Sequence, residues 1–80
     1  MPIYYFDTIE DTELFPDDEG VELQHADEAE AMARHALADL IRERLLDNHL
    51  GSLVIEIRDE QDEPLARFVL TSARVGFNRT

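Results

Sequence analysis

The residues best suited to chemistry are three histidines and a large set of carboxylates. His35 and Asp39 stand four positions apart in a predicted helix, so both side chains share one helical face and could bind a divalent metal. A zinc site needs at least three protein ligands, and no third ligand lies within sequence reach. His25 and His49 flank the helix and are expected at the surface. The sequence therefore predicts no metal site, and we interpret His35 and Asp39 as solvated side chains.

An acidic segment after Pro16 offers the oxygen ligands that calcium prefers. Its carboxylates are Asp17, Asp18, Glu19 and Glu22. They lack the Asp-x-Asp-x-Asp-Gly spacing of a calcium loop. Gly20 is instead typical of a tight turn with a positive φ angle. The segment is predicted to be a solvated acidic turn.

Asp7, in the first predicted strand, could act with a helix carboxylate as a two-metal nuclease site. A nuclease must also attract a polyanionic substrate, which an acidic surface opposes. The serine and threonine hydroxyls, from Thr8 to Thr80, stand in neither a nucleophile-elbow nor a triad context. We therefore predict no catalytic residue and no cofactor, and expect that the chain is not an enzyme. A small hydrolase or nuclease is the third of three functional hypotheses.

The charge of the chain is concentrated at its N-terminal side. The formal net charge is -12, and 11 of the 19 acidic residues lie within residues 1–30, which contain no Lys or Arg. Nucleic-acid binding depends on basic residues that neutralise phosphates, so this balance excludes it. The acids either keep a small domain soluble or form a face that docks on a basic protein.

Length and composition predict one small globular domain. A chain of 80 residues buries only about 60% of its unfolded surface, which predicts a thin stability margin. It contains no cysteine and no apolar stretch long enough to span a membrane, and its first residues lack the pattern of a secretory signal. A cytoplasmic location is expected.

The strands and the helix that position these residues are predicted from the residues that end or begin such elements and from the spacing of apolar residues. Residues 3–8 and 12–15 read as two paired strands, and Pro16 ends the second because it lacks an N–H donor. A short extended piece at residues 21–23 leads to a helix, for which Asp27 is the predicted N-cap and Glu30 completes a capping box. The helix ends at Asn48 or Gly51. Its apolar stripe is Ala29, Met32, Ala33, Ala36, Leu37, Leu40, Ile41 and Leu45.

Residues 53–58 and 65–72 are predicted to form a β-hairpin centred on Gln61 and Asp62. In that register one face is wholly apolar, and its opposed pairs are Ile57–Ala66, Ile55–Phe68 and Leu53–Leu70. On the other face Glu56 lies opposite Arg67 and Val54 opposite Val69. A slip of one residue would lose the Glu–Arg match and oppose apolar to polar residues, so the register is well specified.

The resulting order is β-β-(short β)-α-β-β. We predict an α+β two-layer sandwich, in which one amphipathic helix covers one face of a mostly antiparallel sheet. The domain is expected to span residues 1–73. Residues 74–80 are expected to form a loose tail, from which Phe77 could dock on the core.

The chain resembles a family of short bacterial proteins of unknown function. The resemblance covers nearly the whole chain and rests on three stretches: residues 2–7, the Pro-Asp-x-x-Gly-Val-Glu-Leu pattern of residues 16–23, and residues 54–59 before the last turn. It implies no activity. The family often has glycine near Asp11 and Asp62, and aspartate in these positions still permits left-handed turns.

A second likeness is to the N-terminal domain of HicB antitoxins, which binds and masks a small basic toxin. The matching residues are Phe15, Pro16, Asp17, Gly20, Glu28 and Ala29. The DNA-binding segment of such antitoxins is absent from this sequence. The likeness implies an antitoxin-like role as an alternative function.

The predicted fold leaves one sheet face without a helix, and Tyr5, Val54 and Val69 lie on it. Exposed apolar surface of this kind marks a partner or dimer interface. The predicted partner surface combines this face with the acidic turn: Tyr5, Asp17, Asp18, Glu19, Glu22, Arg58 and Arg67. The first hypothesis is a non-enzymatic module that binds a basic protein, and the second is a self-associating structural or stress-related protein, such as a homodimer.

Overall fold

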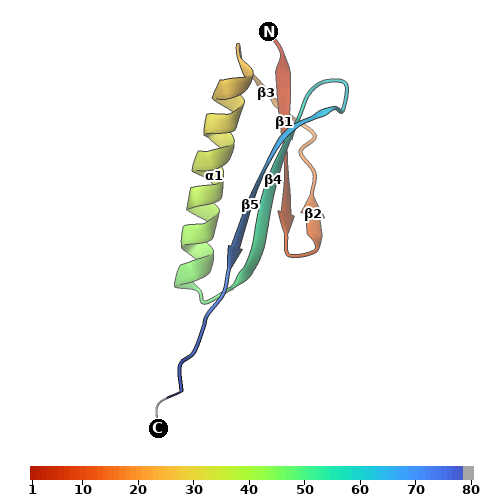
Figure 1. Cartoon of the computed structure of the whole chain (residues 1–80). Helices are drawn as coiled ribbons and strands as arrows, with labels where there is room; N and C mark the ends of the chain where they lie inside the picture. Colours follow the sequence, from red (N-terminus) through yellow and green to blue (C-terminus); the bar gives the residue numbers. More distant parts are fainter. Residues whose placement is uncertain (79–80) are drawn as a thin grey trace.

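A computed structural model of the chain describes residues 1–78. One long helix lies along one face of an antiparallel sheet, which confirms the predicted α+β class (Figure 1). The elements are β1 (Ile3–Glu10), β2 (Glu13–Phe15), β3 (Val21–Glu22), α1 (Ala26–Leu46), β4 (Gly51–Arg58) and β5 (Pro64–Ser72). Strands β1 and β4 each extend two residues further than predicted.

The strand order across the sheet is β2-β1-β4-β5, and β3 pairs with the start of β1. The predicted hairpin register is confirmed between β4 and β5: Glu56 lies opposite Arg67 and Val54 opposite Val69. A bulge at the end of β4 shifts the pairing, so Arg58 lies opposite Pro64. Because β1 lies between β2 and β4, residues far apart in the sequence are brought together along its two edges.

The hydrophobic core lies between α1 and the face of the sheet on which the helix packs, with residues from β1, β4 and β5. The largest fully buried side chains come from alternate positions of β4, which confirms the predicted apolar face; they are Leu53, Ile55 and Ile57. Ala29 and Ala33 are also fully buried. Their small side chains let the helix backbone approach the sheet closely, as expected.

The start of the helix differs from the prediction. The N-cap is His25, which has an extended backbone and makes no side-chain cap hydrogen bond, so the predicted capping box of Asp27 and Glu30 is wrong. Ala26 has a high helix propensity, and the helix extends over it toward β3. Asp27 and Glu28 then lie in the first turn, where their charge complements the helix dipole.

The apolar stripe of α1 also differs from the prediction: Met32 and Ala36 are exposed, and the inward residue at its end is not Leu45. Leu45 is 53% exposed, whereas the Arg44 side chain is only 6% exposed. The guanidinium donates to Glu10 Oε1 at 3.4 Å and to Asp11 Oδ2 at 3.3 Å, and Nε donates to the carbonyl of His49 at 3.4 Å. Carboxylates beside the first turn of the sheet thus supply the counter-charges that let an arginine take the inward position.

Four turns use left-handed backbone conformations, one of them at the end of α1, where Asn48 has a φ of 55°. Gly20 has a φ of 74°, and the two aspartates at positions where the family often has glycine, Asp11 and Asp62, have φ angles of 56° and 63°. The predicted tolerance of aspartate is therefore confirmed. In the tail Phe77 is 87% exposed, so it does not dock on the core, because the chain runs away from the sheet after β5 (Figure 1). Arg79 and Thr80 lie outside the described residues.

Arg44→Ala is expected to destabilise the domain more than Leu45→Ala. The first change removes packing of the buried stem and hydrogen bonds to carboxylates, and should lower the free energy of unfolding by about 1–3 kcal/mol. The second changes an exposed side chain and should stay within about 0.5 kcal/mol. Urea unfolding of both variants measures the difference. An equal or reversed order would show that Leu45 is the inward residue.

Candidate functional site

The sheet face opposite α1 carries a continuous row of apolar side chains. Leu14 of β2 lies opposite Ile9 of β1, Ile9 opposite Val54 of β4, and Val54 opposite Val69 of β5. Opposed residues of a sheet share a face, so these four form one line across the strands, here called the apolar row. Leu14 is 57% and Val69 58% exposed. Within residues 1–78 no second layer covers the row, which confirms the prediction of an open face.

A charged row runs beside the apolar row on the same face. Asp7 lies opposite Glu56, and Glu56 lies opposite Arg67. Arg67 Nε donates to Glu56 Oε2 at 2.8 Å. This pair is the Glu–Arg match predicted from the register, and its two charges neutralise each other at an exposed position.

On the open face, the Arg58 side chain contacts four other residues. Its Nε donates to Asp7 Oδ2 at 2.8 Å, Nη1 to Asp62 Oδ1 at 2.9 Å, and Nη2 to the carbonyl of Asp17 at 2.6 Å. The guanidinium carbon also lies 4.5 Å from the centroid of the Tyr5 ring, a cation–π distance. The hydrogen bond to Asp7 raises the pKa of Arg58, against the opposing effect of burial. These five residues are here called the arginine cluster.

Asp17 organises the acidic turn from within. Its Oδ2 accepts from the backbone N–H of Phe6 at 3.0 Å, and its Oδ1 accepts from Glu19 and Gly20 at 3.0 and 3.2 Å. Its own N–H donates to Asp7 Oδ1 at 2.9 Å. Burial opposes ionisation of this carboxylate, but the three N–H donors outweigh burial and hold the pKa of Asp17 below its ordinary value.

Gly20 seats the acidic turn on the open face. A Cβ atom at this position would lie 2.5 Å from Ile3 Cγ2 and 2.9 Å from Tyr5 Cε1, so only glycine fits. Glu22 lies opposite Ile3, and therefore shares the open face with it. The carboxylates of the turn are thus held at the end of the face where β1 begins.

The seven predicted partner-surface residues fall into three groups. Tyr5, Asp17 and Arg58 meet in the arginine cluster, where their polar groups hold the fold together. Arg67 lies one row away with Glu56. The remaining three, Asp18, Glu19 and Glu22, are exposed and form no ion pair within residues 1–78.

The candidate chemical sites do not assemble. Asp7 lies on the open face while α1 packs on the other, so Asp7 and a helix carboxylate, the pair considered for a two-metal site, are not brought together. His35 and Asp39 are both exposed on the helix. Across the described part of the chain, no three His, Asp or Glu side chains stand close enough to bind one metal ion.

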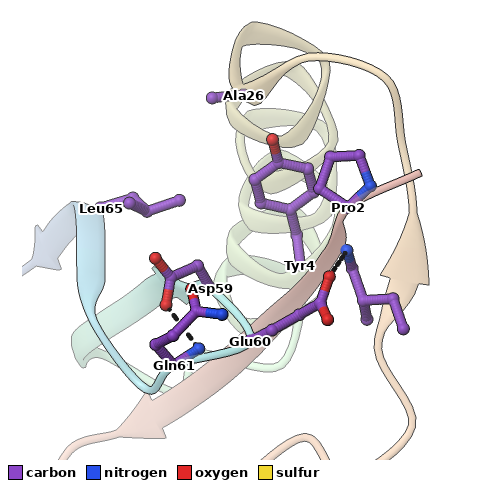
Figure 2. A pocket seen from close by; sticks show the side chains of 8 residues that line it. Pro2, Tyr4, Ala26, Asp59, Glu60, Gln61 and Leu65 are labelled. Atoms are coloured by element: carbon purple, nitrogen blue, oxygen red, sulfur yellow. Dashed lines mark hydrogen bonds between the residues drawn. The ribbon is translucent and has the colours of Figure 1, made fainter.

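A hollow of about 290 Å³ lies between the start of β1, the start of α1 and the β4–β5 turn (Figure 2). Figure 2 shows the Tyr4 ring pointing into it beside Pro2. Glu60 Oε1 accepts from the N–H of Ile3 at 2.9 Å, and Asp59 Oδ1 accepts from the N–H of Gln61 at 2.8 Å. Both carboxylates on its rim therefore stabilise the hairpin turn and the start of β1.

Two features of the open face were not predicted from the sequence. Asp7 and Asp62 are the carboxylate partners of Arg58, although they stand 51 and 4 positions from it along the chain. The only sequence signal was the i, i+4 spacing of Arg58 and Asp62. This spacing predicts an ion pair when both residues lie in a helix, and it makes no such prediction for a hairpin turn.

Asp17→Asn is expected to destabilise the domain at pH 7 and to change its acid sensitivity. Since the folded-state pKa of Asp17 is lowered, its ionised form stabilises the domain above about pH 4, and that contribution is lost as the pH falls through the folded pKa. The difference in urea midpoint between wild type and variant should therefore shrink from pH 7 to pH 3. Asp18→Asn, at an exposed neighbour, is the matched control and should leave both midpoints unchanged; a constant difference for Asp17→Asn would contradict this role.

Arg58→Met is expected to lower the urea midpoint much more than Arg67→Met. Arg58 joins three segments, whereas the exposed Arg67–Glu56 pair should contribute less than about 1 kcal/mol. Arg58→Lys should not restore the midpoint, because an ammonium cannot reproduce the forked, stacked geometry. Equal losses for Arg58→Met and Arg67→Met would show that the cluster is no more than a surface ion pair.

Comparison with known proteins agrees with the resemblance seen in the sequence. A family model described as a domain of unknown function, DUF6894, matches residues 3–71. No match was found among curated proteins or among solved structures. The likeness to HicB antitoxins is not shown by these comparisons. Within residues 1–78 no helix combines the length and apolar character needed to cross a membrane. The family match spans most of the chain, and the protein therefore belongs to the DUF6894 family.

Proposed function

We propose that the protein is a non-enzymatic module that binds a basic protein partner through its acidic turn and the adjoining open face. The observation that carries the proposal is the difference between two sets of carboxylates. Asp7 and Glu56 are neutralised by arginines of the same face. Asp18, Glu19 and Glu22 are exposed, and within residues 1–78 no basic group pairs with them.

The charge of this end of the molecule defines the partner. The arginine cluster uses its only guanidinium inside the fold, so the acidic turn presents unbalanced negative charge. Such a patch attracts a positively charged surface and accelerates the encounter at low salt. The apolar row, which lies beyond the charged row on the same face, offers contact area for apolar side chains and for the aliphatic stems of Arg and Lys. A partner with basic residues around an apolar centre fits both features.

A small basic toxin is one partner with this chemistry, and an antitoxin-like role is one form of the proposal. Supporting observations are the same acidic turn and open face. We also propose a cytoplasmic location, which the absence of cysteine supports.

The triple variant Asp18→Asn, Glu19→Gln, Glu22→Gln is expected to bind the partner more weakly than wild type does. A tagged wild-type chain should retain a basic protein from source-cell extract at low salt and release it as salt rises. For that identified protein, the triple variant should weaken calorimetric binding by roughly 10-fold, because three exposed ion pairs contribute a few tenths to 1 kcal/mol each. Within residues 1–78 none of the three side chains makes an ion pair, so the fold should be unaffected.

The matched control is a triple variant with the same change of charge on the exposed side of α1: Glu28→Gln, Asp39→Asn and Glu43→Gln. It should bind the partner as wild type does. Equal weakening by both triple variants would show that total charge rather than the turn governs binding. Recovery of no basic protein at low salt would contradict the proposed function.

A further inference from the structure

The two outer edges of the sheet are protected to very different degrees. The outer edge of β1 is paired with β3 at its start and with β2 at its end. Between these short strands the Asp17 carboxylate accepts the N–H of Phe6 at 3.0 Å. Side-chain capping, short strands and acidic residues are the devices that keep an edge from pairing with another chain.

The other edge, β5, has none of these devices. It is nine residues long and has its proline at the first position, and among residues 1–78 its only paired strand is β4. Its one charged residue, Arg67, is paired with Glu56. Leu65, Val69 and Leu70 are exposed by 46, 58 and 39%. A long apolar edge strand is a template for the addition of another strand.

The alternation of the backbone identifies which groups of β5 are free. In an antiparallel ladder, the N–H and C=O of one residue point to the same side, and successive residues alternate. The N–H of Phe6 points to Asp17 and away from β4. Ile57, the partner of Phe6, therefore directs its N–H and C=O away from β1 and toward β5. By the same alternation along β5, the backbone N–H and C=O groups that point away from β4 belong to Arg67, Val69 and Thr71.

In one pairing of two β5 strands, the opposed side chains are compatible on both faces of the sheet. Centred on Val69, it places Val69 opposite its own copy, Arg67 opposite the partner's Thr71, and Phe68 opposite the partner's Leu70. It joins the two apolar rows end to end across the new sheet. A pairing centred on Arg67 would instead oppose two guanidinium groups.

The charge distribution favours a second copy of this chain at this edge. Each chain has a net charge of -12, so association must keep the acidic segments apart. Pairing through β5 separates the two β1 strands by about five strand spacings, roughly 24 Å, which exceeds the screening length of about 8 Å. Two basic groups lie near this edge: Arg67 on β5, and Arg34 of α1, whose guanidinium lies 6.0 Å from the Phe68 ring centroid.

We propose that two copies of the protein form a symmetric dimer by antiparallel β5–β5 pairing centred on Val69. This interface uses the backbone edge of β5, whereas the proposed basic partner is recognised by the acidic turn beside the start of β1. The dimer presents two acidic turns at its outer margins and one continuous apolar row between them.

Sedimentation velocity from micromolar to millimolar concentration tests the dimer with two matched variants. Val69→Pro removes an outward N–H that the fold does not use, so the chain should fold and remain monomeric at every concentration at which wild type is dimeric. Leu14→Lys alters the opposite end of the same row at equal exposure, and should leave the dimer intact. A monomeric wild type overturns the proposal. Equal loss of the dimer in both variants also overturns it, because it would indicate stacking of open faces.

A cross-linking experiment covers the case in which Val69→Pro does not fold. The chain has no cysteine, so Val69→Cys and Leu14→Cys each introduce a single thiol at matched exposure. Under mild oxidation the Val69→Cys chain should form a disulfide-linked dimer at least 10-fold faster, because β5–β5 pairing brings the two thiols within bonding reach. Equal rates for the two variants overturn the proposal.

Discussion

The contact on which the open side of the sheet depends is the set of hydrogen bonds made by Arg58. One guanidinium joins the middle of β1, the acidic turn and the β4–β5 turn, through Asp7, Asp17 and Asp62. Stacking on Tyr5 fixes its plane, so the direction of each donor is set. The turn can therefore rest on the sheet without a hydrophobic anchor of its own, because a charged group with several well-placed acceptors tolerates partial burial.

This network also explains why the residues that carry the family resemblance are shared: they have structural roles. Within the stretches that carry it, Asp17 caps the turn, Gly20 permits close approach to Tyr5, and Arg58 forms the cluster. Asp59 accepts from two N–H groups and closes the hairpin turn. Each residue has a role in a turn or in the joining of segments, so the shared pattern specifies an architecture. Functional residues are then better sought outside the pattern, in the exposed acids and along β5.

The parts of the fold that could be predicted are those determined by local periodicity. The β4–β5 register followed from alternation, because a slip would have opposed Ile55 to a polar residue. The partners of Arg58 could not be predicted, since Asp7 joins it only once β1 is known to lie beside β4. Arg44 was missed for a related reason: the alanine-rich stripe fits two helix rotations, and only the carboxylates of Glu10 and Asp11 select the one in which an arginine turns inward.

The difference between the sheet edges follows from the position of the acidic turn in the chain. A turn seated on the sheet beside β1 must run past the outer edge of that strand, and its Asp17 carboxylate then reaches the N–H of Phe6. Residues 73–78, which follow β5, make no corresponding return, since they lead away from the sheet. Protection of one edge and exposure of the other are thus consequences of the same chain order. The acidic turn lies beside the start of β1 and the free strand lies at the other edge of the sheet, so the two proposed surfaces centre on different residues.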